Sequence, residues 1–286
     1  MRNLQQVVLM GVLVVSSVCL AGEATPPAIN VAEEKESPEH GKLNTADATP
    51  VEPGHVELEF GYSYSRAKRC WDADRKLQSR GLCEEHAPSV ALTVGALKNL
   101  DFNINFNYLW LHDKENSPTH GNAIGDIGIG GRYRFLNIEK HNLEVAYIGG
   151  FTIPTGSKSS SGCLGTSQEF WSWENALVVS KDWGLWTANA EVGYSLPFGG
   201  KRSDARGTFT ANLAAGYQVL RWLQPEVELN YVKDFVKSDS ESFSVTGGLV
   251  MPVNDRLRVN VGVQQAVWGR AADQSTSFLL GVKLAF

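Results

Sequence analysis

Charged side chains recur at alternate positions in several segments of the sequence, and their types suit two kinds of chemistry. Opposite charges that meet neutralise one another, whereas charges that border a passage select the solutes that pass. The predicted charge ring comprises Glu57, Glu59, Arg132, Arg134, Glu144, Glu226, Glu228, Arg258 and Lys283. Two interpretations stay open: a structural network of ion pairs, or a selective constriction. Both require the segments to lie side by side.

The segments that carry these charges alternate between apolar and polar residues, a period of two that is typical of β-strands. From Val56 onward, Leu58 and Phe60 fall on one face, whereas Glu57 and Glu59 fall on the other. The same pattern predicts twelve strands, at residues 55–66, 88–97, 101–112, 123–136, 142–154, 168–181, 185–197, 207–220, 225–236, 241–252, 256–268 and 275–286.

The connections between these strands are alternately short and long. Bacterial outer-membrane barrels have an even number of antiparallel strands, short periplasmic turns and longer outer loops. The sequence therefore predicts an all-β fold: a transmembrane, antiparallel, up-and-down β-barrel of twelve strands with both termini in the periplasm. A soluble β-sandwich or lipocalin-like barrel is the alternative. The polar face carries Asn, Gln, Glu and Arg throughout, which favours a barrel that encloses water.

In such a barrel the polar face lines the lumen, where each charge is hydrated or paired. The charge ring then lies in the periplasmic half. Three further carboxylates, Asp126, Glu174 and Glu191, lie higher and have no obvious basic partner on the same face. These three upper-lumen residues are the better candidates for contact with permeant molecules, and a solvated lining is the default alternative.

The six histidines give little support to catalysis. A serine hydrolase needs a nucleophilic Ser activated by a nearby His, but the histidines lie before the barrel, in a predicted turn, or in or beside predicted outer loops. His112 with Asp113 could serve a protease, although a solvated loop pair is the expected role. We predict no enzyme activity, no catalytic residue, no cofactor and no metal site. Scattered Lys and Arg predict no nucleic-acid partner.

The N-terminal region divides into two parts. Residues 1–21 have the basic start, apolar run and small-residue cleavage site of a secretory signal peptide. Residues 22–54 are rich in Pro, Glu, Ala and Thr and show no hydrophobic period, so they are predicted to form a flexible periplasmic leader. An alternative is that part of this leader enters the lumen as a plug. The barrel itself is predicted to span residues 55–286.

Three cysteines, Cys70, Cys83 and Cys163, remain after removal of the signal peptide, in an oxidising compartment. Cys70 and Cys83 fall in one predicted loop, residues 67–87, and could form a disulfide with each other. Other pairings stay open.

The last predicted strand ends in alternating apolar residues, with Phe278, Leu280, Val282 and Leu284 followed by a terminal Phe286. This ending looks like the signal that the outer-membrane assembly machinery recognises, so Phe286 is a predicted assembly signal. The expected partners are therefore outer-membrane lipid, the barrel assembly machinery and a small-molecule permeant.

Several short segments resemble the outer-membrane proteins grouped as the MetA-pathway of phenol degradation family. These segments are Thr45 to Pro50, Gly54 to Glu59 with Tyr62, Gly125-Asp126, Gly131 to Phe135, and Pro154-Thr155-Gly156. The resemblance implies a transporter-like barrel that moves hydrophobic or aromatic compounds. The expected function is passive passage or binding of small molecules in the outer membrane of a Gram-negative bacterium. The alternatives are a structural or adhesive surface barrel acting through its outer loops, and an outer-membrane hydrolase.

Overall fold

The alternating segments form β-strands in the computed structural model, which describes residues 43–160, 162–200, 205–236 and 239–286. The predicted signal peptide, residues 1–21, and residues 22–42 of the predicted leader lie outside these ranges. The elements are β1 (Val56–Trp71), β2 (Leu77–Leu97), β3 (Leu100–Asp113), β4 (His120–Ile124), β5 (Ile127–Ile138), the 3-10 helix η1 (Glu139–His141), β6 (Leu143–Ile153), β7 (Trp171–Trp183), β8 (Trp186–Phe198), β9 (Thr208–Tyr217), β10 (Gln224–Asp234), β11 (Ser240–Asn254), β12 (Leu257–Arg270) and β13 (Ala272–Ala285). Among the described residues, no helix has the length and apolar character needed to cross a membrane.

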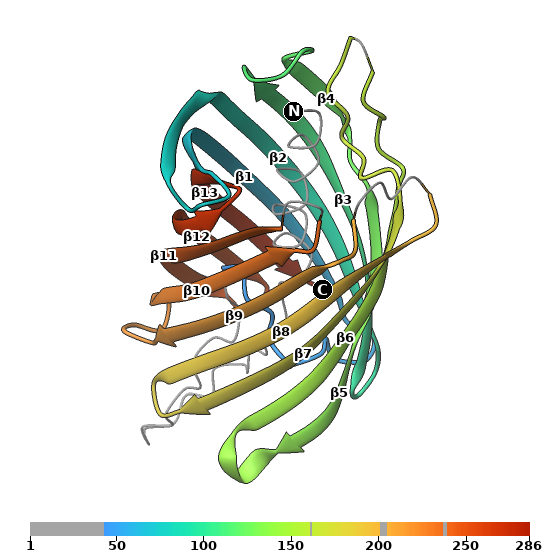
Figure 1. The fold of residues 1–286 in the computed structure, drawn as a ribbon. Helices are drawn as coiled ribbons and strands as arrows, with labels where there is room; N and C mark the ends of the chain where they lie inside the picture. Colours follow the sequence, from blue (N-terminus) through green and yellow to red (C-terminus); the bar gives the residue numbers. More distant parts are fainter. Residues whose placement is uncertain (1–42, 161, 201–204, 237–238) are drawn as a thin grey trace.

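The strands close into a barrel (Figure 1). Neighbours in the chain pair in antiparallel fashion, and β13 pairs with β1 to complete the ring. β4 and β5 both pair with β3, so the 13 strands occupy twelve positions (13 − 1). This arrangement confirms the predicted twelve-strand antiparallel barrel. Closure by β1 and β13 removes the open sheet edges that the interior of a membrane does not tolerate.

The two ends of the barrel differ. The turn end carries the start of β1, the C-terminus and short connections, whereas the loop end carries the longest connections, residues 154–170 among them. At the seam, the Val56 N–H donates to the Phe286 carbonyl at 3.1 Å, and the Phe286 N–H donates to the Val56 carbonyl at 2.9 Å. The Phe286 side chain is exposed beside this seam. Its role as an assembly signal and the periplasmic position of the turn end stay predictions.

The first hairpin is longer than the sequence pattern predicts. Residues 67–87 were expected to form a loop, but strand pairing between β1 and β2 continues to Trp71 and Leu77, which leaves only a short turn. Backbone N–H groups, first that of Lys76, hold the pKa of Asp72 in this turn below its ordinary value. Beyond the lipid layer both faces of a hairpin meet water, so no apolar face is needed and the alternation disappears from the sequence.

The predicted fourth strand, residues 123–136, is interrupted. Gly125 and Asp126 separate β4 from β5, so the strand becomes two pieces that both follow β3. The break places the Asp126 carboxylate where it binds a neighbouring loop, as described below.

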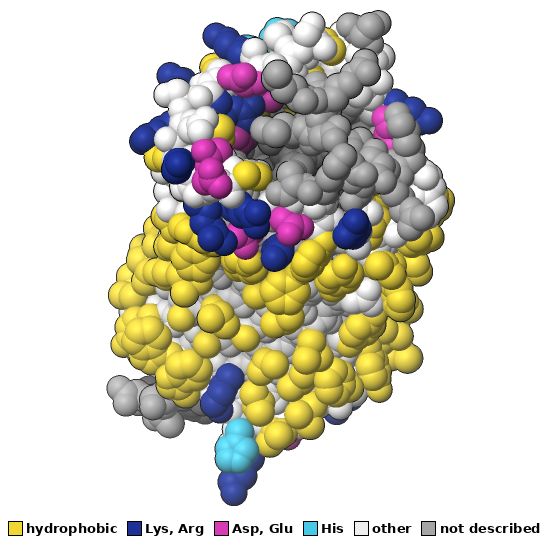
Figure 2. Space-filling model, in the orientation of Figure 1, with side chains coloured by type: hydrophobic (Ala, Val, Ile, Leu, Met, Phe, Trp, Pro, Cys, Tyr) yellow, Lys and Arg dark blue, Asp and Glu magenta, His cyan; other side chains and the backbone are white. Residues whose placement is uncertain are grey.

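Large apolar side chains point outward and polar side chains point inward. Phe102 is 55% exposed, whereas the preceding Asp101 is 0% exposed, the reverse of a soluble protein. Figure 2 shows a broad hydrophobic belt across the face of the barrel in view, with charged side chains gathered beyond it at the loop end. Trp183, Trp186 and Trp222 are exposed near the turn end, as expected of an interfacial aromatic girdle. The exterior therefore contacts lipid and the polar face lines the lumen.

Candidate functional site in the barrel lumen

Residues 43–51, here called the lumen segment, lie inside the barrel (Figure 1, first blue stretch of the chain). All side chains from Asn44 to Thr49 are buried. The sequence analysis placed this stretch in the predicted leader, residues 22–54, with entry of part of the leader into the lumen as the alternative. The described residues 43–51 occupy the lumen. The physical reason is that the barrel wall supplies partners for their backbone groups.

The Glu228 carboxylate, on β10, holds the first residues of the lumen segment. Its Oε1 accepts the backbone N–H groups of Leu43 at 2.9 Å, Asn44 at 2.9 Å and Thr45 at 3.2 Å. The Asn44 side-chain amide donates to Thr246 Oγ1 at 3.1 Å. Hydrogen bonds to a charged acceptor are stronger than neutral ones, so Glu228 is the principal anchor of this part of the segment.

Further anchors follow along the wall. Glu191 Oε2 accepts the Ala46 N–H at 2.9 Å, and Ser180 Oγ accepts the Ala48 N–H at 2.8 Å. The Thr49 hydroxyl donates to Glu144 Oε2 at 2.6 Å. The segment therefore crosses several strands in turn, from β10 to β6, and uses wall side chains in place of a neighbouring strand.

Arg132, on β5, joins the segment to the wall. Its Nη2 donates to Asp101 Oδ2 on β3 at 2.6 Å, and its Nη1 donates to Asp47 Oδ1 in the segment at 3.2 Å. Asp101 Oδ2 also accepts the Val51 N–H at 2.9 Å. The three charged side chains of this cluster are at most 7% exposed. A buried charge is stable only when it is paired, so Arg132 links the two carboxylates.

Small side chains let the segment lie close to the wall. Ala46 and Ala48 pack in one buried cluster with Ala146, Ile148 and Val178. At the other end of the segment, Leu43 sits against Gly248 and Gly262 on β11 and β12. A methyl group added to Gly248 would lie 2.7 Å from Leu43 Cδ1, so the recess needs glycine there.

The remaining members of the predicted charge ring lie on the lumen face. Arg134 Nη1 donates to Glu144 Oε1 at 2.5 Å, and Lys283 Nζ lies 2.6 Å from Glu57 Oε1, so these predicted neighbours do meet. In the strand register, Lys283 on β13 lies opposite Glu59 on β1 and opposite Arg258 on β12. Glu226 is buried on β10, two positions from the anchor Glu228.

The predicted upper-lumen carboxylates already have protein partners. Glu191 binds the lumen segment, and Glu174 Oε1 accepts hydroxyl hydrogen bonds from Ser172 at 2.6 Å and Ser195 at 3.0 Å. Asp126 accepts the backbone N–H groups of Gly156 at 2.9 Å and Gln168 at 2.8 Å. All three residues accept hydrogen bonds within the protein, and their contact with permeant molecules stays a prediction.

Asp126 fixes the connection of residues 154–170, here called the inward loop. Its two oxygens bind the two ends of this loop, and Leu164 at the loop's centre packs into a buried cluster with Ala87, Leu109 and Leu111. Two short motifs of the family resemblance, Gly125-Asp126 and Pro154-Thr155-Gly156, thus meet in space.

Replacing Asp126 with Ala is expected to release the inward loop. Two charge-assisted hydrogen bonds, each of about 1.5–3 kcal/mol, disappear. Trypsin should then cut after the exposed Lys158 much faster than in the unaltered protein. Asp255→Ala in a turn at the opposite end of the barrel is the control. Equal cleavage rates in both variants would show that Asp126 does not hold the loop.

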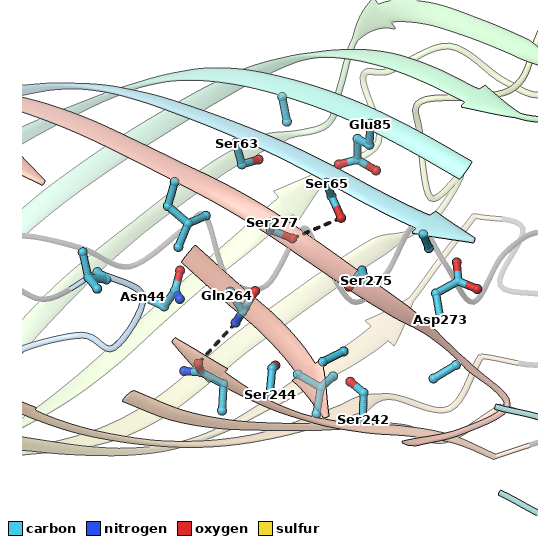
Figure 3. A pocket seen from close by; sticks show the side chains of 18 of the residues that line it. Asn44, Ser63, Ser65, Glu85, Ser242, Ser244, Gln264, Asp273, Ser275 and Ser277 are labelled. Atoms are coloured by element: carbon cyan, nitrogen blue, oxygen red, sulfur yellow. Dashed lines mark hydrogen bonds between the residues drawn. The ribbon is translucent and has the colours of Figure 1, made fainter. Parts of the chain in front are cut away.

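A cavity of about 220 Å³ occupies the lumen on the loop side of the segment, with Leu43 and Asn44 among its lining residues. Hydroxyl groups are prominent in its lining: the serines labelled in Figure 3 are Ser63, Ser65, Ser242, Ser244, Ser275 and Ser277. The sequence analysis did not single out any of these serines, because the alternating pattern marks a polar face without showing which residues surround a space.

Cys70 and Cys83 both line this cavity, yet both are free thiols. In the β1–β2 ladder Cys70 faces Gln78, whereas Cys83 faces Ala67, three residues before Cys70. A disulfide needs the two Cα atoms within about 7 Å of each other and side chains directed at one another. The predicted disulfide is absent because pairing extends through the expected loop and sets the cysteines out of register. Cys163, in the inward loop, is also free.

None of the described histidines lines the cavity. The His112 and His120 rings lie tilted against each other with centroids 4.4 Å apart, and the neighbouring Asp113 carboxylate accepts hydrogen bonds from Arg80 at 2.8 Å. In the described part of the chain, no group of three His, Cys, Asp or Glu side chains is placed to hold a metal ion.

A closed barrel with an apolar exterior and a charged, hydrated interior defines an outer-membrane β-barrel of a Gram-negative bacterium. The chain belongs to the family described as "Putative MetA-pathway of phenol degradation", whose model matches residues 86–283. This match confirms the resemblance seen in the sequence.

The fold is similar to that of a solved outer-membrane channel. The COG4313 outer membrane channel from Pseudomonas putida F1 superimposes with a TM-score of 0.75 at 11% identity, over 86% of this chain and 100% of that chain. The KdgM porin gives a TM-score of 0.47 at 12% identity, over 80% and 99%. The NanC porin gives 0.48 at 8% identity, over 80% and 98%. No curated protein matches this sequence.

Proposed function

We propose that the protein is a passive outer-membrane channel for small molecules, in which the lumen segment narrows the passage. The observation that carries this proposal is the cavity, whose lining includes Leu43 and Asn44 of that segment. A solute that enters from the loop end meets a polypeptide held against the wall by hydrogen bonds, ion pairs and apolar packing. The structure with the same architecture and a TM-score of 0.75 is described as an outer membrane channel, which supports the same class.

The family description supports a small phenolic permeant. A phenol presents one hydroxyl group and one apolar ring, and the cavity offers serine hydroxyls together with apolar side chains such as Ala67, Ala87 and Val232. Passage through such a site needs hydrogen bonds that form and break without a covalent step. We therefore assign no catalytic role to the cavity.

The orientation follows from the connections. In this proposal the turn end faces the periplasm, and the exposed Phe286 is the assembly signal read by the barrel assembly machinery. The loop end then receives solutes from outside the cell, as in other bacterial barrels.

Reconstitution of the mature chain in planar bilayers tests the channel proposal. Stepwise conductance is expected, and added phenol should reduce the ionic current while it occupies the cavity. A barrel that never opens, combined with unchanged phenol uptake in cells that lack the protein, would contradict the proposal and favour a structural or adhesive barrel acting through its outer loops.

A further inference from the structure

The ionisable side chains around the cavity are strongly biased toward acids. Its described lining contains the carboxylates of Glu59, Glu85, Asp234 and Asp273 and no lysine or arginine. Asp273 is paired with Arg80, and Glu59 faces Lys283 across the β1–β13 ladder. Among the described residues, two of the four carboxylates therefore have a nearby cation and two do not.

Glu85 and Asp234 are these two. Glu85 is 8% exposed, its side chain is directed into the cavity, and no hydrogen bond or ion pair joins it to any described residue (Figure 3). Asp234 is 3% exposed and accepts one hydrogen bond, from the Thr208 hydroxyl at 2.7 Å. A carboxylate that is largely removed from solvent without a cationic partner is costly, and a bound cation removes this cost.

The two carboxylates face the same space from well-separated parts of the wall. Glu85 lies on β2 and Asp234 on β10, and the sheet order β2-β1-β13-β12-β11-β10 separates them by five of the twelve positions. Negative charges around a space with low-dielectric walls concentrate cations there. The cavity should therefore attract cations and repel anions.

The rest of the lining favours an organic cation. Alkyl groups can contact Ala87 and Val232, ammonium N–H groups can donate to serine hydroxyls, and Trp71 offers an aromatic surface for a cation. The described residues provide no cluster of three metal ligands. We propose that the cavity binds small alkylammonium ions between Glu85 and Asp234. This proposal deepens the channel function proposed above, on which its consequence for transport rests.

Calorimetric titration of the folded, full-length mature protein in detergent micelles with propylammonium chloride tests the site directly. The double variant Glu85→Gln, Asp234→Asn should bind propylammonium at least about tenfold more weakly, because both charges are lost. The matched control is Glu84→Gln: this neighbouring carboxylate pairs with Arg66 and does not line the cavity. Propanol, the uncharged analogue, should not bind measurably.

Two results would overturn the site: no propylammonium binding to the unaltered protein, or equal binding by the double variant and the control. If circular dichroism shows that the double variant does not fold, the single variant Glu85→Gln replaces it, with a smaller but measurable loss expected.

Reversal potentials in a KCl gradient separate this proposal from the channel proposal. Cation preference in the unaltered barrel, reduced in the double variant and kept in Glu84→Gln, supports both. Propylammonium binding without any conductance would contradict the channel and leave the cation site standing. Conductance with an ion preference that the double variant does not change would contradict the cation site alone.

Discussion

Deletion of residues 43–51 is expected to raise single-channel conductance several-fold while the barrel stays folded. The lumen segment lies against the wall from β10 to β6 and occupies space that would otherwise hold water and ions. A barrel of twelve strands is wide enough for a passage only if its interior is not filled. Planar-bilayer recordings measure the change, and circular dichroism checks the strand content.

A point variant should reproduce part of this effect. Glu228→Gln weakens three backbone hydrogen bonds, because the acceptor loses its charge. The lumen segment should then detach from the wall for part of the time, and the current should fluctuate between two levels. Glu139→Gln, in the exposed helix η1 at the turn end, is the control. If neither the deletion nor Glu228→Gln changes the current, the segment does not narrow the passage.

Arg132→Met is expected to produce the largest effect of any single substitution on the lumen. The guanidinium links Asp47 of the segment to Asp101 of the wall, and both carboxylates are 1% exposed as side chains. Removing one partner of a buried pair costs about 3–5 kcal/mol. Asp47 can escape this cost by moving into water with the segment, whereas Asp101 on β3 cannot. We therefore expect a higher conductance together with a lower free energy of unfolding, measured in urea in detergent micelles.

Two further variants separate these contributions. Arg132→Met combined with Asp101→Asn should recover much of the lost free energy of unfolding, because the uncompensated wall charge is removed. Arg132→Met in the chain that lacks residues 43–51 should change conductance little, since the segment is already gone. Arg256→Met, exposed in a turn, controls for the loss of a positive charge. Additive conductance changes would show that Arg132 does not act through the segment.

The barrel could be predicted from the sequence because lipid imposes a physical pattern. Wherever a strand crosses the membrane, one face must be apolar, so residues such as Phe102 and Asp101 alternate and mark both the strand and its faces. That requirement ends beyond the lipid layer. The upper part of the β1–β2 hairpin was therefore not predicted, and the expected disulfide between Cys70 and Cys83 failed with it.

The site could be predicted only in part. Alternation placed Glu228 and Asp126 correctly on the lumen face, and the opposite charges of Arg134 and Glu144 suggested a pair that does form. It could not show that Glu228 and Asp126 bind backbone N–H groups, because those partners belong to segments without periodicity. The motif Thr45 to Pro50 was the available signal: its small residues fit a narrow space, and its single carboxylate meets Arg132.

The anchoring of the lumen segment also bears on the order of assembly. Leu43 and its acceptor Glu228 are 185 residues apart in the chain, and the contacts of the segment are complete only after strands β3 to β12 stand side by side. The lumen segment precedes all of these strands in the chain, so it can bind only when most of the wall exists. The nine residues of the segment therefore stay exposed to solvent until the barrel wall has formed. Their binding to the wall then marks a correctly closed barrel.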